Sequence, residues 1–120
     1  MILSEITTFL NSEFPLALQE TYDNCGLLIG NSSDEIKGAL ICLDITEKIL
    51  DEAVQKNCNL VISHHPLIFS GIKSLTGRND TERMVIRAIR ENIAIYALHT
   101  NLDNHFDGVN RLLCDKLGIK

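Results

Sequence analysis

Apolar residues along the chain fall into two patterns. Helical spacing, in which apolar side chains recur every three or four positions, predicts amphipathic helices. Short uninterrupted apolar runs predict strands that are buried on both faces of a sheet. The expected helices cover about residues 2–12, 47–57, 81–91 and the segment after Asp107, and the expected strands cover 27–30, 39–43, 60–62 and 93–98.

Polar residues and glycine mark the boundaries of the expected helices. Thr46, Asp80 and Asp107 each stand just before an apolar stripe, where a side-chain oxygen can accept a hydrogen bond from a free backbone N–H. Gly118 follows the last apolar position and is expected to end the final helix.

The order of the elements predicts the fold class. From residue 39 onwards strands and helices alternate, which implies right-handed crossovers between parallel strands of one sheet. We therefore expect an α/β fold with a mostly parallel sheet and helices on both faces. No internal repeat, low-complexity segment or linker divides the sequence, so residues 1–120 are expected to form a single α/β unit.

The composition argues against several classes of protein. Hydrophobic residues make up 45% and charged residues 22%, and no apolar run approaches the roughly 20 residues that cross a bilayer, so no membrane partner is expected. The net charge of −5 argues against a nucleic-acid partner. The arginines at 78, 83, 87 and 90 are expected to form a solvated face, which leaves a phosphate-bearing small substrate open. With no signal peptide and no CxxC pair, we expect free thiols and a cytoplasmic location.

Imidazole and carboxylate side chains follow three of the predicted strands. Because ligands bind at the carboxyl ends of parallel strands, we expect these side chains to meet at one edge of the sheet. Imidazole with carboxylate suits zinc, iron, manganese or nickel, and the lack of clustered thiolates argues against a closed structural zinc site. Asp44 follows the first of these strands, His64 and His65 follow the second, and His99 and Asp103 follow the third.

The two adjacent histidines predict a site for two metal ions. Neighbouring side chains on extended backbone point to opposite sides, and Pro66 favours extended geometry at His65. We therefore expect His64 and His65 to bind one ion each, with Asp103 able to bridge the pair. His99 is expected to hydrogen-bond a metal ligand or to handle a proton.

Each candidate also has a structural interpretation. Asp44 is suited to cap the turn that follows it, and Asn101 to support the turn in which it lies. Ser63 and His64 are not expected to act as nucleophile and base, because strand neighbours point apart and no G-x-S-x-G motif surrounds them. His105, on a polar loop, is expected to be exposed to solvent. A purely structural role for the histidines stays open as well.

Four motifs occur in an order that resembles one known family. HHPLIF followed further along by HTNLD is the most specific combination. Together the motifs resemble the Nif-three-like dinuclear metal-centre family, also called GTP cyclohydrolase 1 type 2 homologues, over essentially the whole chain. The motifs are ETYDNCGLLIG (20–30), CLDIT (42–46), ISHHPLIF (62–69) and ALHTNLDNHFDGVN (97–110).

This resemblance implies an α/β fold with two metal ions in a cleft. His64 and His65 match the family's tandem metal-binding histidines, and Asp103 matches the aspartate of its HTNLD motif. Homo-hexameric rings with metal sites facing an internal cavity are implied too. Family members are at least twice as long and supply a further histidine and glutamate from a later HxxxE segment. The chain is therefore expected to correspond to the N-terminal part of the family's metal-binding domain, an incomplete half of a larger α/β domain.

Two functions are consistent with these residues. The first is a metal-dependent hydrolase, in which two divalent ions polarise a substrate oxygen and activate water while His99 handles a proton. A purine nucleotide substrate is suggested by the family's name alone, because the sequence contains no P-loop and no dinucleotide glycine motif. The second is a non-catalytic metal-binding ring that serves as a scaffold or regulator, since no dedicated nucleophile is evident.

Overall fold

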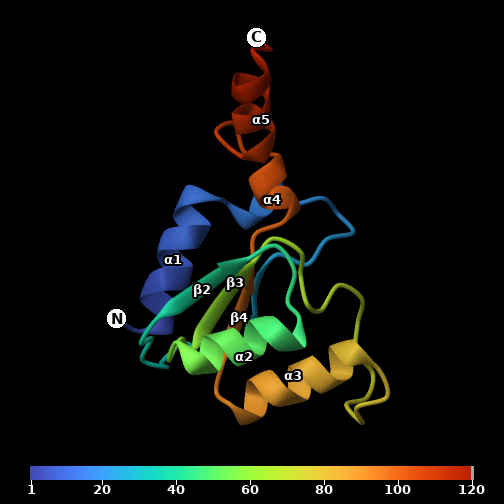
Figure 1. The fold of residues 1–120 in the computed structure, drawn as a ribbon. Helices are drawn as coiled ribbons and strands as arrows, with labels where there is room; N and C mark the ends of the chain where they lie inside the picture. The colour runs from blue at the N-terminus through green and yellow to red at the C-terminus, as the bar shows by residue number, and fades with distance from the viewer. Residues whose placement is uncertain (120) are drawn as a thin grey trace.

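A four-stranded sheet forms the centre of the computed structural model, which describes residues 1–119 (Figure 1). The strands are β1 (Gly26–Ile29), β2 (Ala39–Cys42), β3 (Leu60–Ser63) and β4 (Ala94–Ala97). Their order in the sheet is β1-β4-β3-β2, with β2, β3 and β4 parallel and β1 antiparallel to β4. The predicted mostly parallel α/β sheet is confirmed.

Helices cover both faces of this sheet, as predicted. They are α1 (Leu3–Glu13), α2 (Glu47–Gln55), α3 (Asp80–Arg90), α4 (Thr100–Asp103) and α5 (Val109–Leu117), with a 3-10 turn at Leu16–Leu18. α2 and α3 lie on one face and α1 on the other, while α4 and α5 extend beyond the end of β4 (Figure 1). No helix within residues 1–119 is both long and apolar enough to span a bilayer.

Alternate residues of the central strands divide the core into two apolar clusters. Leu60 of β3 faces α1, where it joins the fully buried Leu3, and the next residue, Val61, faces α2 and α3. This alternation follows from the pleat of a strand and explains why β3 reads as an uninterrupted apolar run. The cluster that contains Val61 also includes Leu50, Ala53, Met84, Ala88 and Ile95.

Two of the three predicted N-caps are wrong. Thr46 caps α2 as predicted, accepting a hydrogen bond from the backbone N of Ile49. Asn79, rather than Asp80, caps α3, because Asn79 is the last residue with extended backbone and its Oδ1 accepts from the N of Glu82 at 2.8 Å. Asp80 is instead the first residue of the helix.

The boundaries of α5 differ from the prediction at its start only. The N-cap is Gly108, so Asp107 lies one residue too early to cap the helix and no side chain does so. Gly118 ends the helix in the left-handed conformation (φ 69°), as predicted.

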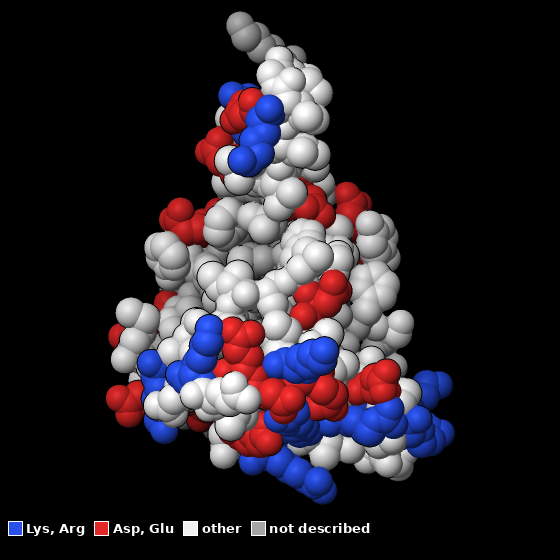
Figure 2. Space-filling model, viewed as in Figure 1, with Lys and Arg blue, Asp and Glu red and all other residues white. Residues whose placement is uncertain are grey.

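Charges of both signs alternate over the face formed by α2 and α3 (Figure 2). Arg87 contacts the carboxylates of Glu47 and Asp51 on α2, each at 2.7 Å, and that of Glu91 at 3.1 Å. The hydrogen bonds that the Arg87 guanidinium donates to Glu47, Asp51 and Glu91 hold its pKa above the ordinary value. The positive charge of Arg87 is thus compensated by its acidic neighbours.

Candidate metal centre

The carboxyl ends of the three parallel strands meet at one edge of the sheet. Backbone hydrogen bonds continue past the strand ends, from the N of His64 to the O of Cys42 at 3.1 Å and from the N of Leu98 to the O of Ser63 at 2.9 Å. These bonds hold the starts of three loops beside one another. The side chains that follow β2, β3 and β4 are therefore brought together, as the strand order requires.

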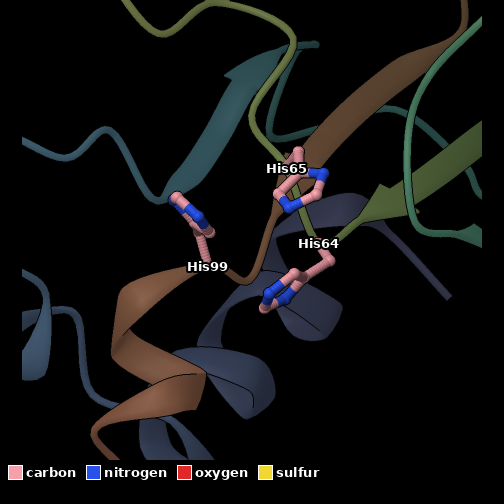
Figure 3. Close-up of side chains that lie close together, drawn as sticks. All are labelled: His64, His65 and His99. Atoms are coloured by element: carbon pink, nitrogen blue, oxygen red, sulfur yellow. The ribbon is translucent and has the colours of Figure 1, made fainter. Parts of the chain in front are cut away.

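Three imidazoles gather at this edge (Figure 3). One ring nitrogen each of His64, His65 and His99 lies within 4.8 Å of those of the other two. The ring centroids are 5.1 Å apart for His64 and His65, 5.2 Å for His64 and His99, and 5.4 Å for His65 and His99. Within residues 1–119, no other group of three His, Cys, Asp or Glu side chains has this spacing.

The expected divergence of the adjacent histidines is wrong. β3 ends at Ser63, and His64 and His65 lie in a bend. The alternation of side chains along an extended strand therefore no longer applies to this pair. His99 was expected to hydrogen-bond a metal ligand or to handle a proton. It lies in the same cluster as the tandem histidines.

The Nδ1 atom of every imidazole in the cluster faces an oxygen acceptor. Carbonyl and carboxylate oxygens only accept hydrogen bonds, so in each neutral ring Nδ1 carries the proton and Nε2 keeps its lone pair. Metal-binding histidines typically have one nitrogen held in this way. The contacts are His64 Nδ1 to the O of Leu98 (2.8 Å), His65 Nδ1 to Asp44 Oδ1 (2.6 Å) and His99 Nδ1 to Asp23 Oδ1 (2.9 Å).

Two carboxylates that the sequence singled out reach the cluster by different routes. Asp44 orients His65 through the bond to Nδ1. Asp103, at the end of α4, has its Oδ1 3.6 Å from Nε2 of His64, and its side chain is 30% exposed. That distance is too long for a hydrogen bond, so the Asp103 oxygen and the His64 nitrogen both stay available to a shared cation.

Asp23 belongs to the site although the sequence did not reveal it. Its fully buried carboxylate accepts hydrogen bonds from His99 Nδ1, from the backbone N and hydroxyl of Thr100, and from the Cys25 thiol at 3.1 Å. Burial by itself raises the pKa of Asp23, but the bonds from Thr100, His99 and Cys25 outweigh it and hold the pKa well below its ordinary value. A buried anion thus fixes the orientation of His99.

The direction of β1 explains how Asp23 reaches the site. Because β1 runs antiparallel to β4, with Gly26 opposite Ala97, the residues before β1 lie at the edge where β4 ends. The DNCG turn, read from the sequence only as turn chemistry, supplies Asp23 at this edge. A four-residue apolar run does not reveal strand direction, so no local signal marked this residue.

Other residues near the cluster have structural roles. Asn101 is fully buried; it accepts a hydrogen bond from the N of His99 and donates to the O of Phe14, supporting the turn as predicted. The hydroxyl of Ser63 is buried and donates to a backbone carbonyl two residues on, consistent with its exclusion as a nucleophile. His105 packs against the ring of Phe14, with the ring centroids 5.2 Å apart, and is half-buried where exposure to solvent was expected.

The donor set suits a borderline divalent metal. Three imidazoles with a nearby carboxylate are ligands that zinc, iron, manganese and nickel share. No thiolate joins the cluster, and all four cysteines are free and half-buried. The residues present therefore fit a divalent metal site that protein side chains do not fully close.

Fold and site together define an α/β protein with a histidine cluster at the carboxyl edge of its sheet. Residues 1–120 match the family model Duf34/NIF3 (NGG1p interacting factor 3). The chain belongs to this family, as the motifs predict.

Similar proteins agree with the family assignment. A GTP cyclohydrolase 1 type 2 homolog of Staphylococcus epidermidis is 44% identical over 121 residues, which cover 100% of this chain and 32% of that protein. The crystal structure of a Staphylococcus aureus hypothetical protein is 40% identical with a TM-score of 0.92, covering 100% of this chain and 40% of that one. A Bacillus cereus protein related to NIF3 is 38% identical with a TM-score of 0.91, covering 100% and 33%. The chain thus spans about a third of the length of the curated relatives it matches.

Proposed function

We propose that the protein is a metal-dependent hydrolase in which His64, His65 and Asp103 bind two divalent metal ions. The observation that carries this proposal is the histidine cluster, in which an oxygen holds every Nδ1 and, within residues 1–119, no hydrogen bond engages an Nε2. When bound, such ions supply Lewis acidity that polarises a substrate oxygen and lowers the pKa of water. Zinc, iron, manganese and nickel all suit the donors.

His99 is proposed as the group that handles a proton. Its Nδ1 donates to the buried anion of Asp23, which fixes the tautomer and leaves Nε2 able to accept a proton. His99 would also suit a third histidine ligand, since one of its ring nitrogens lies within 4.8 Å of those of His64 and His65. Replacing His99 distinguishes the two roles. Loss of a proton acceptor lowers turnover alone, whereas loss of a metal ligand also lowers the metal content.

A nucleotide or related small molecule is the proposed substrate. The support is the name GTP cyclohydrolase 1 type 2 homolog carried by the curated relatives. In this chain, the side chains of His65 (48% exposed) and Asp103 (30% exposed) leave one side of the cluster accessible to a small molecule. Hydrolysis is the reaction class that fits a water-accessible metal site with a neighbouring proton acceptor.

The experiment combines metal analysis with turnover of the full-length protein. We expect bound divalent metal in the wild type, strong loss of metal in His64→Ala, and no change in His105→Ala, the fourth histidine. Hydrolysis of GTP and of simple phosphoesters is expected to fall with metal content and to return when metal is added back. A wild-type protein without bound metal, or turnover unaffected by His64→Ala, would contradict the proposal.

A non-catalytic ring-shaped scaffold is the second candidate function. The observation that favours it is a set of exposed apolar side chains on or directly after β2 and on α5, because exposed apolar surface is typical of interaction sites. Self-association into a homo-hexamer would cover such side chains. Bound metal without turnover, together with a hexameric mass in solution, is the outcome that selects this function. The exposed residues are Ile41, Leu43, Leu112, Leu113 and Leu117.

A further inference from the structure

A cavity of about 590 Å³ adjoins the histidine cluster, under the loop between β3 and α3. Pro66, which follows His65 in the chain, is among its lining residues. Phe69 lines it too, and its ring centroid lies 6.4 Å from that of His99. Small-molecule sites have volumes of roughly 300–1,000 Å³. A ligand that fills the cavity therefore contacts Phe69, whose ring lies beside that of His99.

Two cationic side chains line this cavity. The side chain of Arg78 is 72% exposed; its guanidinium donates to the hydroxyl of Ser74 at 2.8 Å and lies 3.5 Å from Oε1 of Glu82. Lys73 is exposed, and none of the ion pairs found within residues 1–119 involves it. Its ammonium group is free to contact an anion.

The carboxylate that lines the cavity is already compensated. Oε2 of Glu82 accepts hydrogen bonds from the backbone N of Thr76 at 3.2 Å and of Arg78 at 3.0 Å, and from the Thr76 hydroxyl at 3.3 Å. These hydrogen bonds anchor the loop before α3 to the carboxylate of Glu82. The hydroxyl groups that line the cavity and suit an anion as further donors are those of Ser70, Ser74 and Thr81.

We propose that this cavity binds a phosphate-like anionic group of a small molecule, with Lys73 and Arg78 as its cationic contacts. The remainder of the molecule extends past Phe69 to the histidine cluster. Lysine provides a mobile point charge and arginine a planar fork of donors, and both are common partners of phosphate oxygens. The use of this subsite for a substrate rests on the proposed metal-dependent function, whereas anion binding itself does not.

Inorganic phosphate is the probe that tests the subsite. It is titrated into the ¹⁵N-labelled full-length protein, with metal removed by a chelator, and amide shifts are followed. We expect saturable shifts in residues 70–79 that weaken with added salt. Lys73→Gln is expected to weaken phosphate binding at least about fivefold, because a charged contact is lost. Lys48→Gln, an exposed lysine on α2 outside the cavity, is the matched control and should leave the affinity unchanged.

Two outcomes would overturn the subsite. One is the absence of saturable shifts, and the other is equal phosphate affinity in wild type and Lys73→Gln. Phosphate binding that occurs only with metal present and is lost in His64→Ala would place the anion on the metal, against this proposal but in favour of the metal site. Saturable binding by a protein that takes up no metal would support the subsite while the proposed hydrolase function fails.

Discussion

Nδ1 of His99 lies 2.9 Å from Oδ1 of Asp23, a carboxylate with no solvent-exposed side-chain surface. The two residues are far apart in the chain and meet only because β1 is antiparallel to β4. The pair resembles the carboxylate–histidine arrangement that orients metal ligands and proton acceptors in many enzymes. It makes Asp23 the positioning residue of His99.

Replacing Asp23 tests that role. If His99 binds metal, Asp23→Asn is expected to weaken zinc binding about 10- to 100-fold, because the amide holds the imidazole less firmly. If His99 only handles protons, zinc affinity stays and turnover falls. Competition with a chelating dye measures the affinity of the full-length protein. Asp107 is an exposed aspartate outside the cluster, so Asp107→Asn should change neither zinc affinity nor turnover. An Asp23→Asn protein with unchanged zinc affinity and unchanged turnover would contradict the assignment.

The junction between α4 and α5 depends on a glycine. A Cβ atom at Gly108 would lie 1.8 Å from the carbonyl oxygen of Leu102, the residue before Asp103. Gly108→Ala must therefore displace backbone near Asp103, and we expect it to cost about 1–3 kcal/mol in the free energy of unfolding. Gly71→Ala is the matched control, since a Cβ there meets nothing within 4 Å. Equal unfolding midpoints in urea for the two variants would refute the close approach.

Glu82 makes the stability of the loop before α3 dependent on pH. The hydrogen bond from the backbone N of Arg78 is the main cause that lowers the pKa of Glu82 below its ordinary value of 4.5. Because the folded-state pKa is the lower one, this stabilisation is complete above pH 4.5 and is lost as the pH falls through the folded-state value.

The variant Glu82→Gln isolates this effect. We expect a lower urea midpoint than wild type at neutral pH and a smaller difference between the two proteins in acid. Urea titrations at neutral pH and below the ordinary glutamate pKa measure both. Glu13→Gln, an exposed position on α1, should follow wild type throughout. A constant difference between Glu82→Gln and wild type at all pH values would contradict the titration of this group.

Arg87 joins α2 to α3 across the face of the sheet. Its side chain is 25% exposed and contacts Glu47 and Asp51 of the neighbouring helix. Arg87→Gln is expected to lower the free energy of unfolding by about 1 kcal/mol, and high salt should reduce the difference because partly exposed ion pairs are screened. Thermal unfolding at low and high salt measures this. Arg90→Gln, an exposed arginine on the same helix, serves as control.

Much of the fold could be predicted because its elements carry strong local patterns. The stripes of α2 and α3 and the apolar runs of β3 and β4 each determine an element type, and alternation determines parallel pairing. That pairing placed the residues after β3 and β4 at one edge. His64, His99 and Asp103 could therefore be named as neighbours without any coordinates.

Features set by tertiary context could not be predicted from local patterns. On extended backbone the side chains of His64 and His65 would point apart. The bend at these two residues turns both side chains toward the same region. Asp23 reaches the site through the direction of β1, which four apolar residues do not specify. The choice of Asn79 over Asp80 as a cap depended on which residue keeps extended backbone, a one-residue difference beyond the resolution of sequence patterns.

Anomalous X-ray diffraction from crystals of metal-loaded full-length protein tests the central claim most directly. The account predicts metal peaks about 2.0–2.3 Å from ring nitrogens of His64 and His65, with a carboxylate oxygen of Asp103 in the same coordination sphere. Peaks located away from these side chains, or no peak at the cluster under saturating metal, would contradict it.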